Sequence, residues 1–170
     1  MQISTFKLTV VALCLTAAMS SAVSAQERYA VSADNLEVTD SKTGLIWRRC
    51  AEGMVWKGKT CTGEAVFLNQ AAAAARAKEA AAAGPAWRLP TMKELSSIVA
   101  PREADVDKAA IDPTVFPATP LARFWTSSSV GTGSFNVGTG YFMYVAFTEG
   151  SAGEAARTAP GAVRLVREAK

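Results

Sequence analysis

Histidine is absent from all 170 residues of the sequence. This absence excludes catalytic triads and general bases built on histidine, together with metal centres that use histidine ligands. A dominant charge is also lacking, because 18 basic residues stand against 15 acidic ones and the net charge of +3 is dispersed along the chain. Nucleic-acid-binding domains carry a basic patch or stripe, so we expect no nucleic-acid partner.

Long apolar runs are missing as well, with one exception near the start. The run LTVVALCLTAAM, residues 8–19, follows Lys7 and leads through small residues to Gln26. These are the parts of a secretory signal peptide, and the run is shorter than the roughly 20 residues that span a bilayer. We therefore expect residues 1–25 to be a cleaved signal peptide rather than an uncleaved membrane anchor. The residue directly after the expected cleavage site is Gln26 and not a cysteine, which argues against a lipid anchor.

The expected mature chain, residues 26–170, has the usual length of one domain and is long enough to bury one core. We expect this domain to be exported to the periplasm or outside the cell, with no transmembrane segment. No repeat of 20–50 residues is visible, which excludes a solenoid. The sequence leaves the oligomeric state open.

Cysteine is scarce, since Cys14 leaves with the signal peptide and only Cys50 and Cys61 remain. In an oxidising compartment these two cysteines most simply pair as a disulfide. Closing a loop of about 12 residues would stabilise the fold by roughly 3 kcal/mol in the chain-entropy model. The alternative, a catalytic or metal-bound thiol pair, lacks partners, because two thiolates alone do not complete a zinc site.

Alternating apolar residues and turn residues predict several short strands. Regions rich in proline or glycine, and one without any pattern, are expected to be irregular. The predicted strands lie in a strand–turn–strand unit at 36–49, a hairpin at 50–61, and single strands at 123–129, 141–149 and 162–168. The predicted irregular segments are 26–35, 101–122, 130–140 and 150–161.

Two helices are predicted between the early and the late strands. The alanine-rich stretch 63–84 lacks proline and interior glycine, and Gly84 followed by Pro85 ends it. A second, short helix follows Thr91 and stops before Pro101. Strands, two helices and then antiparallel strands indicate an α+β fold, with the helices packed on a mainly antiparallel sheet and joined by long loops.

The joint before the second helix, WRLPTMKEL at residues 87–95, has a defined local geometry. Pro90 restricts Leu89 to an extended conformation, and Thr91 with Glu94 forms a T-x-x-E capping box. We interpret the joint as a structural signature and favour a structural role for Arg88 and Glu94 over a catalytic one. Its residues are Trp87, Arg88, Leu89, Pro90, Thr91, Glu94 and Leu95.

Two other stretches resemble binding loops only superficially. VGTGSFNVGTG, residues 130–140, lacks the lysine and the following helix of a phosphate loop, so a hairpin loop is favoured. READVDK, residues 102–108, lacks the glycine and terminal glutamate of a calcium loop, so a solvated charged loop is favoured. We expect no cofactor and no metal.

Aromatic side chains provide the remaining functional signal. Trp56 lies among lysines and glycines, so it is a candidate for stacking on a sugar, although most tryptophans are core residues. Trp47, Trp87 and Trp125 are expected in the core. Further ligand-binding candidates come from the glycine-rich loop and its end, because loops on a rigid scaffold carry recognition. They are Ser134, Asn136 and Tyr141.

Six ordered motifs then connect the sequence with a known family. TGLIWRRC, VWKGKTCTG, WRLPTMKEL, IDPTVFPATP, FWTSSS and VRLVR follow the order of the Lcl C-terminal domain family, formerly a domain of unknown function, which residues 36–167 resemble. The resemblance implies a fold similar to C-type lectins and to the formylglycine-generating enzyme. The namesake domain ends a collagen-like adhesin that binds sulfated polysaccharides and forms trimers, whereas this sequence has no Gly-X-Y segment. The calcium-dependent sugar motifs of C-type lectins are also absent.

These observations favour a binding domain over an enzyme. The first hypothesis is an exported module for a glycan, such as a polysaccharide, or another cell-surface ligand. The second is a structural or protein-interaction module of the bacterial envelope, with an envelope protein as partner. A third, an enzyme of the formylglycine-generating type, requires a reactive thiol, which a Cys50–Cys61 disulfide would remove.

Overall fold

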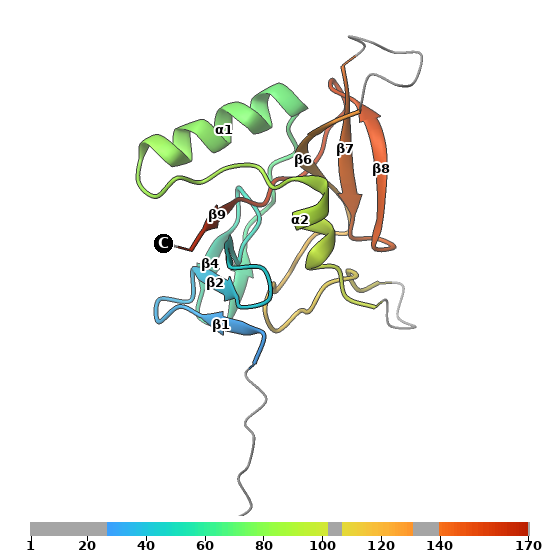
Figure 1. The fold of residues 1–170 in the computed structure, drawn as a ribbon. Coiled ribbons are helices and arrows are strands. Elements are labelled where there is room, and N and C mark those ends of the chain that lie inside the picture. Colours follow the sequence, from blue (N-terminus) through green and yellow to red (C-terminus); the bar gives the residue numbers. More distant parts are fainter. Residues whose placement is uncertain (1–26, 102–106, 131–139, 170) are drawn as a thin grey trace, which may run out of the picture.

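The computed structural model describes residues 27–101, 107–130 and 140–169 (Figure 1). The expected signal peptide at 1–25 and the candidates Ser134 and Asn136 lie outside the described residues. The described chain is α+β, with two helices and three antiparallel sheets. No helix among the described residues has both the length and the apolar character needed to cross a membrane.

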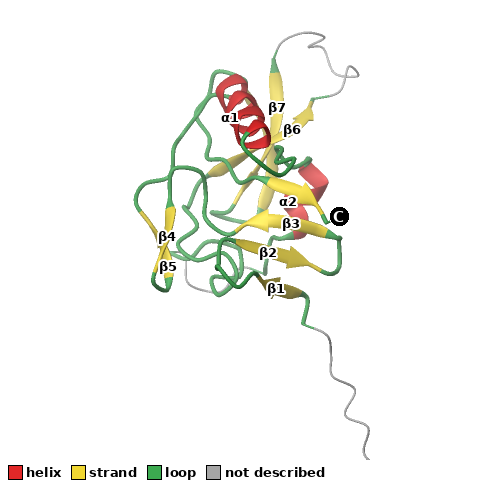
Figure 2. Cartoon of the chain, turned by 90° about the vertical axis from the view of Figure 1, so that its left-hand side faces the viewer, coloured by secondary structure: helices red, strands yellow, loops and turns green. Residues whose placement is uncertain are grey.

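A four-stranded sheet with the order β1–β2–β3–β9 is built from both ends of the chain (Figure 2). Its strands are β1 (Tyr29–Val31), β2 (Glu37–Asp40), β3 (Leu45–Arg48) and β9 (Val166–Glu168). The turn predicted between β2 and β3 is confirmed, with Gly44 at φ 69°. The prediction that 26–35 is irregular is wrong for β1. Three residues are too few to show alternation, and β1 is fixed by its pairing with β2 and by Tyr29 packing edge-on against Phe116.

The predicted hairpin is present as β4 (Val55–Lys57) and β5 (Thr60–Thr62). Gly58, at φ 66°, supplies the positive φ that a tight hairpin turn requires. The predicted disulfide is confirmed, because Cys50, after β3, is bonded to Cys61 in β5 with an S–S distance of 2.07 Å. The hairpin therefore stands beside the four-stranded sheet and is covalently attached to the end of β3 (Figure 2).

A three-stranded sheet is formed by β6 (Arg123–Ser129), β7 (Tyr141–Ala146) and β8 (Ser151–Ala156). The prediction that 150–161 is a loop is wrong for 151–156, because β8 pairs with β7 along its whole length. Gly153 in β8 and Gly161 after this strand make space for aromatic rings of neighbouring strands. A Cβ at Gly153 would lie 2.6 Å from the Tyr144 hydroxyl, and one at Gly161 would lie 2.8 Å from the Trp125 indole nitrogen.

Residues 162–168 connect the two larger sheets, so the predicted strand at this range is only partly formed. Ala162 makes a parallel bridge with Phe124 of β6, and the chain then enters β9 beside β3. Between them, Arg164 is fully buried. Its guanidinium donates to the carbonyls of Arg48 and Arg49 and to the Thr119 hydroxyl, and burial lowers its pKa to about 9.

Helix α1 (Gln70–Ala82) is shorter at its start than the predicted range of 63–84. Residues before it are held in extended form, because Val66 donates to the Glu52 carbonyl and Leu68 bridges to Gly161. Asn69 then caps the helix by accepting from the Ala72 amide. Helix α2 (Met92–Ser97) confirms the predicted capping box of Thr91 and Glu94.

The core consists of two clusters, one on each side of the sheets. One joins α2 and the loop after it to the four-stranded sheet through residues such as Trp47, Leu95 and Phe116. Ile111, Val115 and Phe116 are buried, so the long segment 101–122 is attached to this cluster where it is described. The second cluster places α1 on Trp87, Trp125 and Leu165. Trp47, Trp87 and Trp125 are all buried, as their positions predicted.

Candidate functional site

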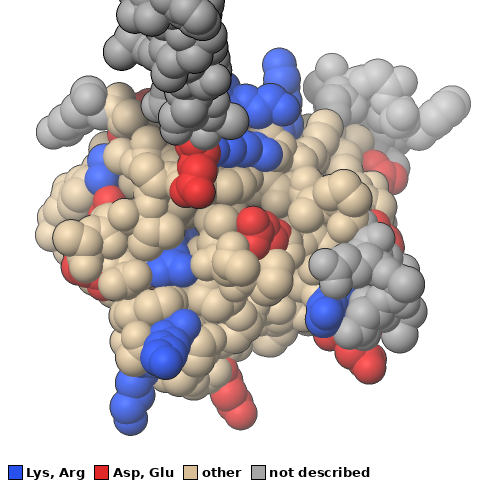
Figure 3. Space-filling view, turned by 90° about the horizontal axis from the view of Figure 1, so that it is seen from below, with Lys and Arg blue, Asp and Glu red and all other residues tan. Residues whose placement is uncertain are grey.

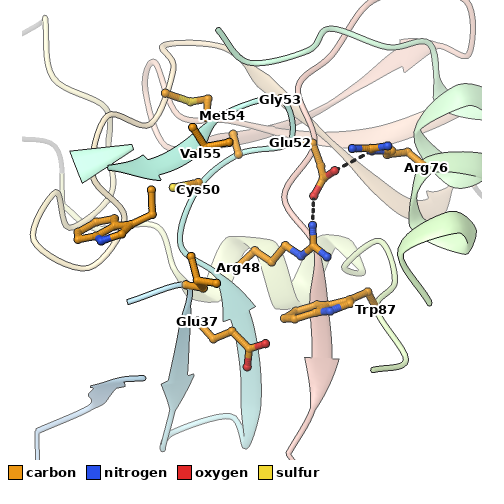
Figure 4. A pocket seen from close by; sticks show the side chains of 12 residues that line it. Glu37, Arg48, Cys50, Glu52, Gly53, Met54, Val55, Arg76 and Trp87 are labelled. Atoms are coloured by element: carbon orange, nitrogen blue, oxygen red, sulfur yellow. Dashed lines mark hydrogen bonds and ion pairs between the residues drawn. The ribbon is translucent and has the colours of Figure 1, made fainter. Parts of the chain in front are cut away.

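A cleft of about 540 Å³ lies between the β4–β5 hairpin, the four-stranded sheet and α1 (Figure 4). The chain from Cys50 to Trp56 forms one side, and Arg48 and Trp87 lie opposite. Arg76 reaches in from α1. Leu36 and Val55 are exposed apolar side chains in its lining, at 51% and 63% exposure. The cleft thus combines apolar surface with a small number of charged groups.

Glu52 lies between two arginines within this cleft. Its carboxylate accepts from Arg48 Nη1 at 2.8 Å and from Arg76 Nε at 2.8 Å, with one oxygen used by each (Figure 4). The Glu52 side chain is nearly fully buried, whereas Arg48 and Arg76 retain 36% and 49% exposure. Hydrogen bonding to Glu52 raises the pKa of Arg76. Both arginines therefore keep further N–H donors that are accessible to a ligand.

The backbone around Glu52 fixes the position of this carboxylate. The Glu52 amide donates to the Val163 carbonyl, and the Glu52 carbonyl accepts from the Val66 amide. Gly53 follows at φ 91°, where a Cβ would lie 2.7 Å from both the Glu64 carbonyl and the Val66 nitrogen. Only glycine allows this close approach of the two segments. Glu52 is therefore held by main-chain contacts on two sides.

Trp87 forms the wall of the cleft opposite the hairpin. The guanidinium carbons of Arg48 and Arg167 lie 5.0 and 5.2 Å from the centroid of its ring. Arg167 Nη2 also donates to Glu37 Oε2 at 2.6 Å, which connects β9 with β2. Stacking of this kind orients a guanidinium while leaving its edge free for hydrogen bonds.

Trp56, the aromatic candidate from the sequence, lines the same cleft and is partly exposed. The Arg49 guanidinium lies 4.4 Å from the centroid of its ring. Arg49 is itself fixed, because it donates to the carbonyls of Val115 and Thr114. The ring is therefore positioned by a buried cation.

The signature joint lies next to the cleft, with its charged residues paired. Arg88 donates to both carboxylate oxygens of Glu94, at 2.8 and 2.9 Å, and also to Glu168. These hydrogen bonds lower the pKa of Glu94 and raise that of Arg88. The Arg88 backbone bridges to Val166 of β9, while Trp87, Leu89, Pro90 and Leu95 are buried. The joint thus connects α2 to the sheet.

Tyr141 lies far from Trp56 in the fold. It begins β7 at the end next to the segment 131–139, whereas β4 lies beside the four-stranded sheet (Figures 1 and 2). Its side chain is 40% exposed. The sequence candidates therefore do not form one site where they are described. Nor do the described residues bring together three acidic or cysteine side chains that could hold a metal.

Sequence reasoning missed the group of Arg48, Glu52 and Arg76 in the cleft. Arg48 and Glu52 are not on one helix, so their spacing carries no pairing signal. Arg76 is the single arginine of the alanine-rich helix, which is a weak signal at best. Their meeting depends on the path of residues 63–69, which the sequence analysis assigned to a helix. Elsewhere, seen from below, basic and acidic side chains are interspersed rather than gathered by sign (Figure 3).

Comparison with known proteins gives one match. The model of the family described as the Lcl C-terminal domain matches residues 36–167, which is more than half of the chain and includes every residue of the cleft named above. No curated protein and no solved structure matches the chain.

Proposed function

The chain belongs to the Lcl C-terminal domain family, and from this premise we propose that it is an exported, non-enzymatic binding domain that recognises a glycan or another cell-surface ligand. The cleft between Trp56 and Trp87 is the proposed site. A C-type-lectin-like relationship of the α+β fold belongs to the same proposal and rests on the family resemblance.

One observation carries this proposal. A cleft of ligand size combines two tryptophans with guanidinium groups that Glu52 holds in place and that keep further N–H donors for a ligand. Aromatic faces suit the apolar faces of sugar rings, and convergent polar groups suit their hydroxyls. Because Glu52 accepts from both arginines, the cleft neutralises part of its own charge. A neutral or weakly charged ligand rich in acceptor oxygens fits this arrangement best.

The test is a glycan array probed with residues 26–170 at two salt concentrations, followed by titration of the strongest glycan. Trp56→Ala should weaken binding about tenfold, the order expected for one lost stacking contact of roughly 1.4 kcal/mol. Tyr141→Ala is the matched control at the other candidate position and should bind like the unaltered chain. Loss of glycan binding with Tyr141→Ala alone would place the site at the end of β7. An array without hits would reject glycan recognition.

A protein-interaction module of the envelope is the second candidate, favoured by exposed apolar residues around the cleft. Leu36 and Val55 line it, and Val66, 37% exposed, packs beside Gly53. Exposed apolar groups that gather in one place often mark a protein contact. Light scattering over a range of concentrations tests self-association. A constant monomer mass, together with a positive glycan array, would remove this candidate.

A further inference from the structure

The β4–β5 hairpin has few attachments to the rest of the described chain. β4 and β5 pair only with each other among the described strands. The contacts that hold it include Trp56 against Arg49, the bond from Cys61 to Cys50, and Met54, directly before β4, against the first core cluster. Neither cysteine belongs to the two core clusters. The position of the hairpin therefore depends strongly on one disulfide, while the folding of the two cores does not.

This disulfide can be reached from one side. Cys50 is partly exposed and lines the cleft, whereas Cys61 is only 3% exposed (Figure 4). Thiol–disulfide exchange requires access of a thiolate to one of the two sulfurs. Cys50, the partly exposed half of the disulfide, is where we expect a thiolate to enter.

We propose that the Cys50–Cys61 disulfide is a thiol-exchange site entered through the cleft, and that its reduction releases the β4–β5 hairpin while the rest of the domain stays folded. The co-substrate is a dithiol, either a small molecule or a protein carrying a reduced cysteine pair. The consequence for ligand binding rests on the function proposed for the cleft.

The reaction is an exchange of two electrons. A thiolate of the dithiol attacks Sγ of Cys50, the Cys50–Cys61 bond breaks, and Cys61 leaves as a thiolate. The second thiolate of the reductant then attacks the reductant sulfur that is bonded to Cys50. Cys50 leaves as a thiolate. The protein gains two electrons and the two protons lost by the dithiol, which ends as a disulfide.

Release of the hairpin changes the cleft directly. Residues from Cys50 to Trp56 form one of its sides, and Cys61 lies opposite Trp56 in the hairpin register. Without the disulfide, the contact with Arg49 remains to position the Trp56 ring. Opposite the hairpin, Arg48 and Trp87 keep their mutual contact, and Glu52, which precedes the hairpin on its own side, keeps its contacts with Arg48 and with the backbone. Reduction therefore removes one wall and leaves the other in place.

Hydrogen exchange of the full-length mature chain, with and without dithiothreitol in non-denaturing buffer, tests the proposal. Alkylation of free thiols, counted by mass spectrometry, reports reduction. Amides of residues 54–62 should exchange at least tenfold faster after reduction, while those of α2 and of β2 and β3 should change less than twofold. A disulfide that resists the dithiol, an unchanged hairpin after reduction, or faster exchange throughout the domain would each overturn the proposal.

The double variant Cys50→Ser/Cys61→Ser provides the matched control. It should reproduce the fast exchange at 54–62 and no longer respond to dithiothreitol. A glycan found on the array should bind the reduced chain at least tenfold more weakly. If the array gives no hit, the exchange experiment still decides the release of the hairpin, so failure of the binding function and failure of the exchange site remain distinguishable.

Discussion

Gly53 is the residue on which the side of the cleft formed by Cys50 to Trp56 depends most directly. It combines a positive φ with a contact that leaves no space for a Cβ between it and the backbone of Glu64 and Val66. Gly44 has a similar φ of 69°, but no atom lies within 4 Å of its Cβ position. The two glycines therefore separate the cost of backbone conformation from the cost of a clash.

We expect Gly53→Ala to lower the free energy of unfolding by about 2–4 kcal/mol, since conformational strain and overpacking add. Gly44→Ala should cost only about 1–2 kcal/mol, the strain of the left-handed region alone. Denaturant unfolding measures both values. Equal losses for the two variants would contradict the close approach at Gly53.

The Glu94 carboxyl should make the free energy of unfolding depend on pH at the signature joint. Hydrogen bonds from Arg88 lower the pKa of Glu94 below its ordinary value. A carboxyl whose folded pKa is depressed stabilises the protein above its unfolded pKa of about 4.3, and this stabilisation is lost as the pH falls through the folded value. Burial opposes the shift but is outweighed.

Glu94→Gln should therefore lower the free energy of unfolding by less than about 1 kcal/mol at pH 7, because the pair is partly exposed to solvent. The difference from the unaltered chain should shrink as the pH falls below about 4.3 and vanish below the depressed folded pKa of Glu94. Glutamine keeps the capping position, so Thr91→Ala serves as control, with a loss of about 1 kcal/mol. Unfolding curves at several pH values measure both. A Glu94→Gln difference that is constant with pH would contradict the account.

Among the elements, α1 shows how a helix of small residues is held in place. Its buried residues are Gln70, Ala73 and Ala77, which approach the cluster around Trp87 and Trp125. Such close packing allows no large side chain at the interface. The helix is also tied to the body through Arg76 and Glu52.

Ala73→Leu should lower the free energy of unfolding by about 1–3 kcal/mol through overpacking. Ala75, two positions along on the same helix, is exposed, so Ala75→Leu should stay within about 0.5 kcal/mol of the unaltered chain. Thermal or denaturant unfolding distinguishes the two. A neutral Ala73→Leu would mean that α1 packs less closely than the structure describes.

The elements also show what the sequence can and cannot predict. The capping box of α2 was predictable, because Thr91 and Glu94 act on neighbouring backbone groups. The start of α1 was not, since residues 63–69 favour a helix locally but pair with Glu52 and Gly161 instead. β8 was missed for a similar reason: its alanines and Gly153 carry no strand signal, and their fit to Tyr144 becomes visible only in three dimensions.

The residues of the candidate site, like the elements, were only partly predictable from the sequence. The disulfide was predictable because only two cysteines fall in the expected mature chain, and Trp56 was a candidate because of its polar surroundings. The charged group of Arg48, Glu52 and Arg76 was not, because these residues come from three separate segments. Nor does alternation along 162–168 reveal that Arg164 is buried among carbonyl oxygens.

On the scale of the whole molecule, residues from both ends of the described chain build the framework around the cleft. β9 completes the sheet that begins with β1, and residues 162–168 connect this sheet to β6. One wall of the cleft therefore belongs to a closed framework, and the other belongs to a hairpin attached through a disulfide. The sheet forms one wall of the cleft and the separately attached hairpin forms the other. This arrangement suits a binding site whose affinity depends on the position of the hairpin.

If the ligand binds in this cleft, a bulky side chain that fills the cleft must weaken binding. Val55 and Val31 are both exposed strand valines, but only Val55 lines the cleft. Calorimetric titration of the strongest array glycan should show at least tenfold weaker binding for Val55→Trp and unchanged binding for Val31→Trp, with both melting temperatures near that of the unaltered chain. Binding by Val55→Trp at full affinity would place the site elsewhere and contradict the account.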